Sequence, residues 1–266
     1  MSDNPGRMAD LRRYRYLFEQ MVRRELRQKY QGSALGVAWY VVNPLVLMGA
    51  YYVMFGVALK PGFRHADYPL FLMVGIVVWM FFSQSVLTAA PSLLDQGALI
   101  RKAPFPRELI PGAVVTVQAV TFVAVLGLVG IVTLVLRGTF DFPLLLLPPL
   151  LAALYAFTLG LSLAVAALHA HFRDVAPILS AALLPWFFIS PIFFEPADIA
   201  QRHIVRFAMQ WVNPVAPFIE SIRSVIYDGA APSLQTLAYV AVASVVALLV
   251  GRALFARLQA DLAVIV

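Results

Sequence analysis

The side chains that could bind a ligand in this chain are mostly aromatic rings, amides and hydroxyls. Aromatic faces stack against the C–H faces of sugars, and they also form belts where a membrane meets water. Amides and hydroxyls beside them could bind sugar hydroxyls or hold helices together. The aromatic residues gather in three apolar stretches, as Trp39, Tyr40, Tyr51, Tyr52, Trp79, Phe81, Phe82, Trp186, Phe187 and Phe188. The nearby polar residues are Asn43, Gln84, Ser85, Thr88 and Gln118.

Groups for covalent, metal-assisted or acid–base catalysis are scarce in the sequence. It has no cysteine, three lysines and four scattered histidines, and it lacks GxSxG, HExxH and DxD motifs. It also lacks the GxxxxGK[ST] loop that cradles ATP phosphates. His169 and His171 have no carboxylate or thiol at metal-ligand spacing, so we interpret them as the polar end of a helix. The sequence predicts no catalytic residue, no metal site and no cofactor bound by this chain.

Six long stretches without Asp, Glu, Lys or Arg place the aromatic residues in a membrane. About 20 helical residues cross a bilayer core of about 30 Å, and a charge at its centre costs about 3 kcal/mol or more. Of the 266 residues, 61% are hydrophobic, which exceeds the need of a soluble domain. We therefore predict an all-α integral membrane protein with six transmembrane helices. They cover about 37–58, 68–90, 112–136, 143–168, 177–194 and 235–251.

The charges divide unevenly between the two sides of such a bundle. The side with the N-terminus carries 14 lysines and arginines and 8 acids, while the other side carries 6 of each. Because basic loops stay in the cytoplasm, both termini are predicted to be cytoplasmic. The first 36 residues have no uninterrupted apolar core, so we do not expect a cleavable signal peptide. The net charge of +6 then reflects orientation and contact with membrane lipids, and no nucleic-acid partner is expected.

Three segments outside the spans have helical patterns of their own. Residues 10–31 form an apolar stripe with a cationic face, which is typical of a helix lying in the membrane plane, as a lipid anchor or as a docking platform. The sequence of loop 91–108 predicts a short helix that Ser92 caps and Pro104 ends. This segment is either a docking site for another protein or an ordinary basic loop on the cytoplasmic side. Segment 195–233 predicts two short half-apolar helices, either re-entrant or lying on the surface.

Small residues four positions apart predict close helix packing in the fourth and sixth spans. They are Ala156, Gly160 and Ala164 in one and Ala243, Ala247 and Gly251 in the other.

Several short motifs occur along the chain, and their order carries a resemblance to a known family. They are residues 23–39 with Asn43-Pro44, residues 99–108, His171-Phe172-Arg173-Asp174, Ser190-Pro191-Ile192, and residues 211–214 with Pro217 and 220–223. In this order they resemble the permease subunits of type-2 ABC exporters for polysaccharides, which include O-antigen (Wzm-like), capsule and teichoic acid exporters. The resemblance covers nearly the whole chain.

The resemblance implies a homodimer of six-span subunits in the bacterial inner membrane, working with two copies of a separate ABC ATPase subunit that binds ATP and Mg. Segment 1–36 would hold the amphipathic interface helix, and 37–266 would form the transmembrane domain. Within it, 91–108 would be the cytoplasmic coupling loop and 195–233 the periplasmic gate. The substrate would be a lipid-linked glycan that leaves the cytoplasm between the protomers.

The resemblance also implies roles for individual residues. Coupling to the ATPase would use Ser92, Leu99, Arg101, Lys102, Phe105 and Arg107. The pyrophosphate of the lipid-linked glycan would meet Arg23, Arg24 and Arg27, because guanidinium groups bind phosphate oxygens in pairs. The glycan path would be lined by Tyr51, Tyr52, Trp79, Phe82 and Gln84. The gate would contain Phe207, Trp211, Phe218, Glu220 and Arg223.

Three other classes of protein are alternatives. An exporter of a lipid or small molecule in the same superfamily would share the docking loops and differ in the lining of its path. A membrane-embedded transferase would need acids at the span ends, and Asp67, Asp141 and Glu195 show no cooperative spacing. A passive channel would not need a coupling helix.

Overall fold

The computed structural model describes residues 5–30, 36–54, 67–102, 105–137, 142–195 and 207–259. Every regular element within these ranges is a helix, and none is a strand. Several predicted features lie outside them: the end of the first span at 55–58, Pro104, the part of the gate segment at 196–206, and the chain ends at 1–4 and 260–266. The prediction of an all-helical chain is confirmed for the described part.

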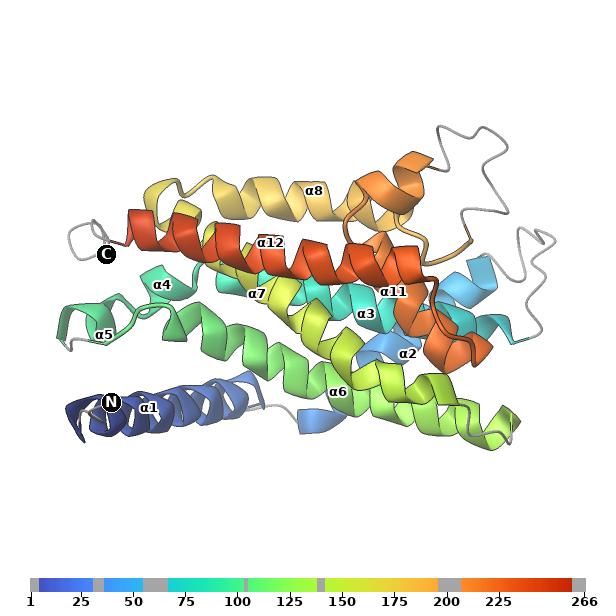
Figure 1. The fold of residues 1–266 in the computed structure, drawn as a ribbon, viewed down its shortest axis with the longest axis horizontal. Helices are drawn as coiled ribbons and strands as arrows, with labels where there is room; N and C mark the ends of the chain where they lie inside the picture. The colour runs from blue at the N-terminus through green and yellow to red at the C-terminus, as the bar shows by residue number, and fades with distance from the viewer. Residues whose placement is uncertain are drawn as a thin grey trace.

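Within the described ranges, four helical segments are long and apolar enough to cross a membrane, and they begin at Tyr68, Leu109, Phe142 and Leu234. They contain α3 (Tyr68–Ala89), α6 (Leu109–Arg137), α7 (Leu147–His171) with the preceding turn η3 (Phe142–Leu146), and α12 (Leu234–Leu258). These helices run side by side along the long axis of the molecule (Figure 1). They occupy the second, third, fourth and sixth of the predicted spans.

The first and fifth predicted spans are represented by shorter apolar helices. They are α2 (Trp39–Tyr51), which follows the turn η1 (Gly36–Ala38), and α8 (Val175–Ile189). With a rise of 1.5 Å per residue, 15 residues in α8 extend only about 22 Å, less than the bilayer core. The turn at Ser190–Pro191 ends α8. Among the described residues, four helices have full spanning length, where the sequence predicts six.

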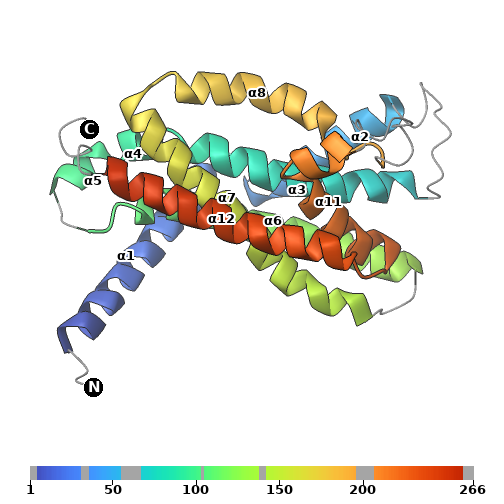
Figure 2. The ribbon, with the colours of Figure 1, turned by 45° about the horizontal axis from the view of Figure 1, so that its top comes forward.

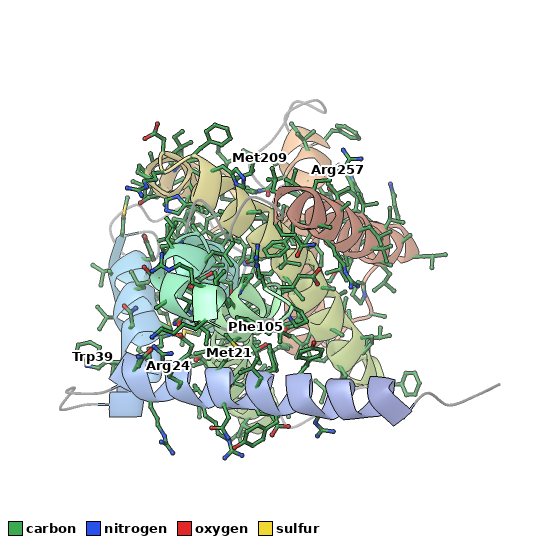
Figure 3. All side chains as sticks on the ribbon, turned by 90° about the vertical axis from the view of Figure 1, so that its left-hand side faces the viewer. Met21, Arg24, Trp39, Phe105, Met209 and Arg257 are labelled. Carbon is green, nitrogen blue, oxygen red and sulfur yellow. The ribbon has the colours of Figure 1, made fainter. Side chains whose placement is uncertain are left out.

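The interface helix predicted at 10–31 is α1 (Pro5–Tyr30), which begins five residues earlier than expected. It lies at an angle across one end of the bundle instead of running along it (Figures 2 and 3). The short helices α4 (Ser92–Asp95) and α5 (Gly97–Lys102) and the last turns of α12 lie at the same end (Figure 1). A separate apolar cluster holds this end together, with Met21, Leu93, Ile100, Ile110, Leu163 and Phe255 among its buried members.

Helix α11 (Ala216–Arg223) lies at the opposite end of the bundle, between the π-helical turns η4 (Ala208–Val212) and η5 (Ser224–Asp228) (Figure 1). All its residues except Glu220 are buried, and it contacts α3, α7 and α12. The turn η5 ends at Gly229, whose φ of 65° suits a residue without a Cβ. The second predicted helix of the gate segment is therefore an internal element and does not lie on the surface.

Candidate functional site

The end of the bundle that carries α1, α4 and α5 is tied together by polar contacts. Gln96, between α4 and α5, accepts a hydrogen bond from the Arg24 guanidinium and donates one to the Glu25 carboxylate, both at 3.3 Å. Arg107 donates to the carbonyl of Gln259, which follows α12. These contacts connect α1, the loop 91–108 and the end of α12 in one surface, which we call the docking end after the role predicted for it. Figure 3 looks onto this end, with Met21 and Arg24 on the inner side of α1.

Gln96 is a residue that sequence reasoning missed. The signal was the Gln96-Gly97 pair within the short helix expected between Ser92 and Ile100, because glycine weakens a helix interior. The structure indeed divides that helix at Gln96.

The six predicted coupling residues occupy different depths at the docking end. Arg101 and Lys102 are exposed in the last turn of α5, whereas Leu99, Phe105 and Arg107 are half-buried. The capping role expected for Ser92 is wrong. Pro91 holds the N-cap position of α4, and the buried Ser92 hydroxyl donates to the carbonyl of Ala89 at 2.7 Å, because that carbonyl lies in the preceding turn.

The three predicted phosphate-binding arginines are exposed on α1. Arg24 is oriented by its hydrogen bond to Gln96, while Arg23 and Arg27 lie on either side of it in the sequence. Arg24 therefore contacts the loop between α4 and α5, and Arg23 and Arg27 are exposed on the same helix.

Three of the aromatic residues predicted to line a glycan path pack in or against the core instead, namely Tyr51, Trp79 and Phe82. The centroid of the Trp79 ring lies 5.6 Å from that of Phe82 and 5.7 Å from that of Phe187. The centroids of Tyr51 and Phe187 are 5.5 Å apart. Trp79 is 5% exposed and Phe82 is 1% exposed. Their faces are already covered by neighbouring rings, so the prediction that these two residues line a path is not supported within the protomer.

The other two predicted path residues are accessible. Tyr52 is 40% exposed at the end of α2. Gln84, on α3, lines a cavity of about 380 Å³ between α1, α2, α3 and α6. Lys29 of α1 lines the same cavity, and sequence analysis assigned it no role.

An asparagine in the motif at 211–214 organises the turn where α8 meets the gate segment. The buried Asn213 side chain accepts hydrogen bonds from the Trp186 indole at 2.9 Å and from the Val215 backbone amide at 3.1 Å. Its amide group donates to the Ser190 hydroxyl at 2.9 Å. One side chain thus satisfies three partners on two chain segments, a role that the spacing of the sequence motifs did not reveal.

Replacing Asn213 with alanine is expected to lower the free energy of unfolding by about 2 kcal/mol, because the buried indole N–H and Val215 amide would lose their acceptor. Thermal unfolding of the purified protein in detergent would measure the change. Gln235→Ala is the control, since Gln235 is exposed at the start of α12. Equal unfolding temperatures for the two variants would contradict the role given to Asn213.

Arg223 anchors the gate segment from inside the bundle. The guanidinium is 3% exposed and donates to the carbonyls of Pro191 at 2.8 Å and Ile192 at 3.0 Å. It lies over the Phe71 ring, 3.7 Å from the centroid. A Cβ at Gly75 would come within 2.5 Å of the guanidinium, so only glycine leaves room for it there. Arg223 therefore joins α11, α3 and the turn after α8.

Acidic groups keep this buried cation charged. Burial lowers the pKa of Arg223 to about 10, and the charges of Glu220, Glu195 and Asp228 act in the opposite direction. The guanidinium therefore remains protonated at neutral pH.

The remaining predicted gate residues lie on η4 and α11 or directly before η4. Phe218 is fully buried, with its ring 4.9 Å from that of Phe157. The Trp211 carbonyl accepts a hydrogen bond from the Tyr239 hydroxyl at 3.0 Å, and Glu220 accepts one from the Gln210 amide at 3.4 Å. Phe207 is 57% exposed. These residues share one end of the bundle, but Phe207 and Phe218 differ completely in burial.

The histidines at the end of α7 have structural partners. His169 is buried, and its Nδ1 accepts a hydrogen bond from the Ala176 amide of α8 at 3.3 Å. His171 Nδ1 contacts the Ala167 carbonyl at 2.9 Å. This arrangement agrees with the interpretation of the pair as a polar helix end.

Comparison with known proteins places the chain in a family. A family model described as ABC-2 type transporter matches residues 16–227. The O-antigen export system permease protein RfbA of Myxococcus xanthus is 31% identical over 248 residues, which are 93% of this chain and 94% of that protein. The protein of the same name in Klebsiella pneumoniae is 26% identical over 92% of this chain and 93% of its own length. The polysialic acid transport protein KpsM of Escherichia coli is 24% identical over 89% of this chain and 91% of its own length. Because the family match runs from α1 through the gate segment, this chain belongs to the ABC-2 type transporter family.

Proposed function

We propose that this chain is the permease subunit of an ATP-driven exporter that moves a lipid-linked polysaccharide, of the O-antigen or capsule type, across the bacterial inner membrane. The observation that carries the proposal is the docking end, where an interface helix and a short basic helix are fixed to each other through Gln96. The similar proteins carry names of O-antigen export and polysialic acid transport. Both facts fit a membrane subunit that receives movement from a cytoplasmic partner.

The partner in this proposal is a separate ABC ATPase subunit that binds ATP and Mg. Two copies of it would dock on a homodimer of this chain. Exposed cations in the last turn of α5, Arg101 and Lys102, would contact it. The proposed docking end faces the cytoplasm together with both termini, as the excess of basic residues on that side predicts.

The proposed membrane domain has six spans, with α2 and α8 completing the four long helices. A short helix such as α11 is tolerated at membrane depth only where protein covers it, and α3, α7 and α12 do cover it. This burial supports a re-entrant gate at the periplasmic end. The glycan would pass between protomers, past exposed groups such as Tyr52, while Arg23 and Arg27 would attract its pyrophosphate.

Replacing Arg101 and Phe105 together with alanine is expected to reduce ATP-driven export at least about tenfold, because a small surface must transmit the movement of the ATPase. Export of glycan into inverted membrane vesicles, ATPase activity and co-purification of the ATPase subunit would be measured. Thermal unfolding should change little, since Arg101 is exposed and Phe105 is only half-buried.

The control for this experiment is Arg257→Ala, which removes an exposed arginine at the same end of the bundle (Figure 3). It should leave export unchanged. Undiminished export in the double variant would reject the proposed coupling surface. A protein that never co-purifies with an ATP-binding chain would reject the proposed function itself.

A further inference from the structure

The cavity beside Lys29 has walls from four helices. Its volume is about 380 Å³, and its lining is formed by Lys29, Trp39, Asn43, Pro44, Val77, Met80, Phe81, Gln84, Gln118, Thr121, Phe122 and Val125. Of these lining residues, Lys29 is the one with a charge. The cavity lies beneath the end of the interface helix, where α1 passes α6.

The two longest walls change from polar to apolar in the same direction. On α3 the lining begins with Gln84 nearest the docking end and reaches Val77 two turns deeper. On α6 it begins with Gln118 and reaches Val125, again two turns deeper. Seven helical residues extend about 10 Å. The cavity is therefore an amphipathic slot about 10 Å long, with its polar end at Lys29 and its apolar end toward the middle of the bundle.

Lys29 is held at the polar end by a chain of hydrogen bonds. Its ammonium nitrogen donates to the Gln118 side-chain oxygen at 2.7 Å, and the Gln118 amide donates to the Thr88 hydroxyl at 3.4 Å. Thr88 in turn donates to the carbonyl of Gln84 at 2.5 Å. An ammonium group fixed at the mouth of an apolar slot attracts an anion whose remaining part is hydrocarbon.

We propose that this cavity binds an amphiphile with a phosphate head group, placing the phosphate on Lys29 and one hydrocarbon chain between α3 and α6. Two sources share this chemistry: the isoprenoid phosphate anchor of a glycan, and an anionic phospholipid of the bilayer. If the ligand is the isoprenoid phosphate anchor, the cavity binds the cargo of the proposed exporter, and this identification of the cargo rests on the proposed function. Binding itself needs neither the ATPase subunit nor a glycan.

The charge of Lys29 should make this binding depend on pH. Lys29 is exposed as a whole residue, but partial desolvation of its ammonium group lowers its pKa to about 8, so the ammonium form prevails at pH 7 and the neutral amine at pH 9.5. The other residues that line the cavity, on α2, α3 and α6, are neutral, and the nearest charged residues before Lys29 on α1 are Arg27 and Glu25. A monophosphate has a second pKa of about 6, so between pH 7.5 and 9.5 the change in charge belongs to Lys29.

Photolabelling of the purified full-length chain in nanodiscs tests the proposal, with a photoactivatable farnesyl monophosphate as the probe. Labelling of the wild type should decrease between pH 7.5 and 9.5. Lys29→Gln should reduce labelling at least about fivefold and make it independent of pH over that range. Val125→Trp should also reduce it, by filling the apolar end. Arg15→Gln is the matched control, because Arg15 is an exposed cation of the same helix that pairs with Glu19. Thermal unfolding would verify that each variant is folded.

The outcomes separate the possible ligands. Competition by a long polyprenyl phosphate but not by phosphatidylglycerol assigns the site to an isoprenoid anchor, and the reverse assigns it to a phospholipid. Equal labelling of wild type and Lys29→Gln, or equal labelling by the corresponding farnesyl alcohol probe, would overturn the proposal. Normal export in a variant that no longer binds the probe would reject the site as the place of the cargo, while intact labelling without any export would reject the proposed function alone.

Discussion

Replacing Gly251 with alanine is expected to destabilise the bundle by about 3 kcal/mol, because the added methyl group would meet backbone on the facing helix. A Cβ at Gly251 would overlap the carbonyl of Gly160, and a Cβ at Gly160 would overlap the carbonyl of Ala247. Backbone cannot move aside as a flexible side chain can, so α7 and α12 would have to separate. Thermal unfolding in detergent, followed by tryptophan fluorescence, would measure the loss, and Gly160→Ala should resemble it.

Gly127→Ala is the matched control for this prediction. Gly127 lies in α6, where a Cβ would meet no atom within 4 Å. The same substitution there should be neutral or stabilise the protein by up to about 1 kcal/mol, since alanine favours helix more than glycine does. If the Gly251→Ala and Gly127→Ala variants unfolded at the same temperature, that result would contradict the direct backbone contact between α7 and α12.

The contact between these helices was predictable from the sequence. Small residues four apart mark the faces on which helices approach closely, and Gly160, Ala247 and Gly251 meet as that pattern indicated. The four long spans were predictable for an equally simple reason: a charge within the bilayer is costly, so charge-free stretches stand out. The amphipathic period likewise revealed α1.

Side-chain assignments inside the bundle were harder to predict, because an aromatic residue in a span has the same sequence signal whether it lines a path or packs. Trp79 and Phe82 were expected at a path and lie in the core. Ser92 was expected as a cap and binds the preceding turn instead. Partners far apart in sequence, such as Gln96 with α1, leave no local pattern at all.

Arg223 shows the same limit at the gate segment. Its place in the motif at 220–223 suggested a gate residue, but its partners lie more than 30 residues away, at Pro191 and Ile192, and on α3. A charged residue between two predicted spans reads as a surface group. The burial and the paired carbonyl acceptors appear only when α11 folds into the bundle.

Replacing Arg223 with methionine is expected to cost about 3 kcal/mol or more, because two carbonyls would lose a charged donor and the nearby acids would lose their cation. Arg223→Lys should cost nearly as much, since an ammonium group cannot reproduce the planar fork that reaches both carbonyls. Thermal unfolding would measure both. Arg252→Met is the control, because Arg252 is 68% exposed and forms a surface ion pair with Glu108.

Gly75 provides an independent test of the same anchor. Gly75→Ala should destabilise the protein because the methyl group would displace the guanidinium of Arg223. Methionine at position 223 is flexible and uncharged, so Gly75→Ala should destabilise the Arg223→Met variant less than it destabilises the wild type. The effects of substitutions at two residues in contact are generally not additive. Fully additive losses would mean that Gly75 and Arg223 act separately. A non-additive result would show that the guanidinium of Arg223 packs directly against Gly75 of α3. The same guanidinium bonds to Pro191 and Ile192, so one group on α11 would then contact both α3 and the turn after α8.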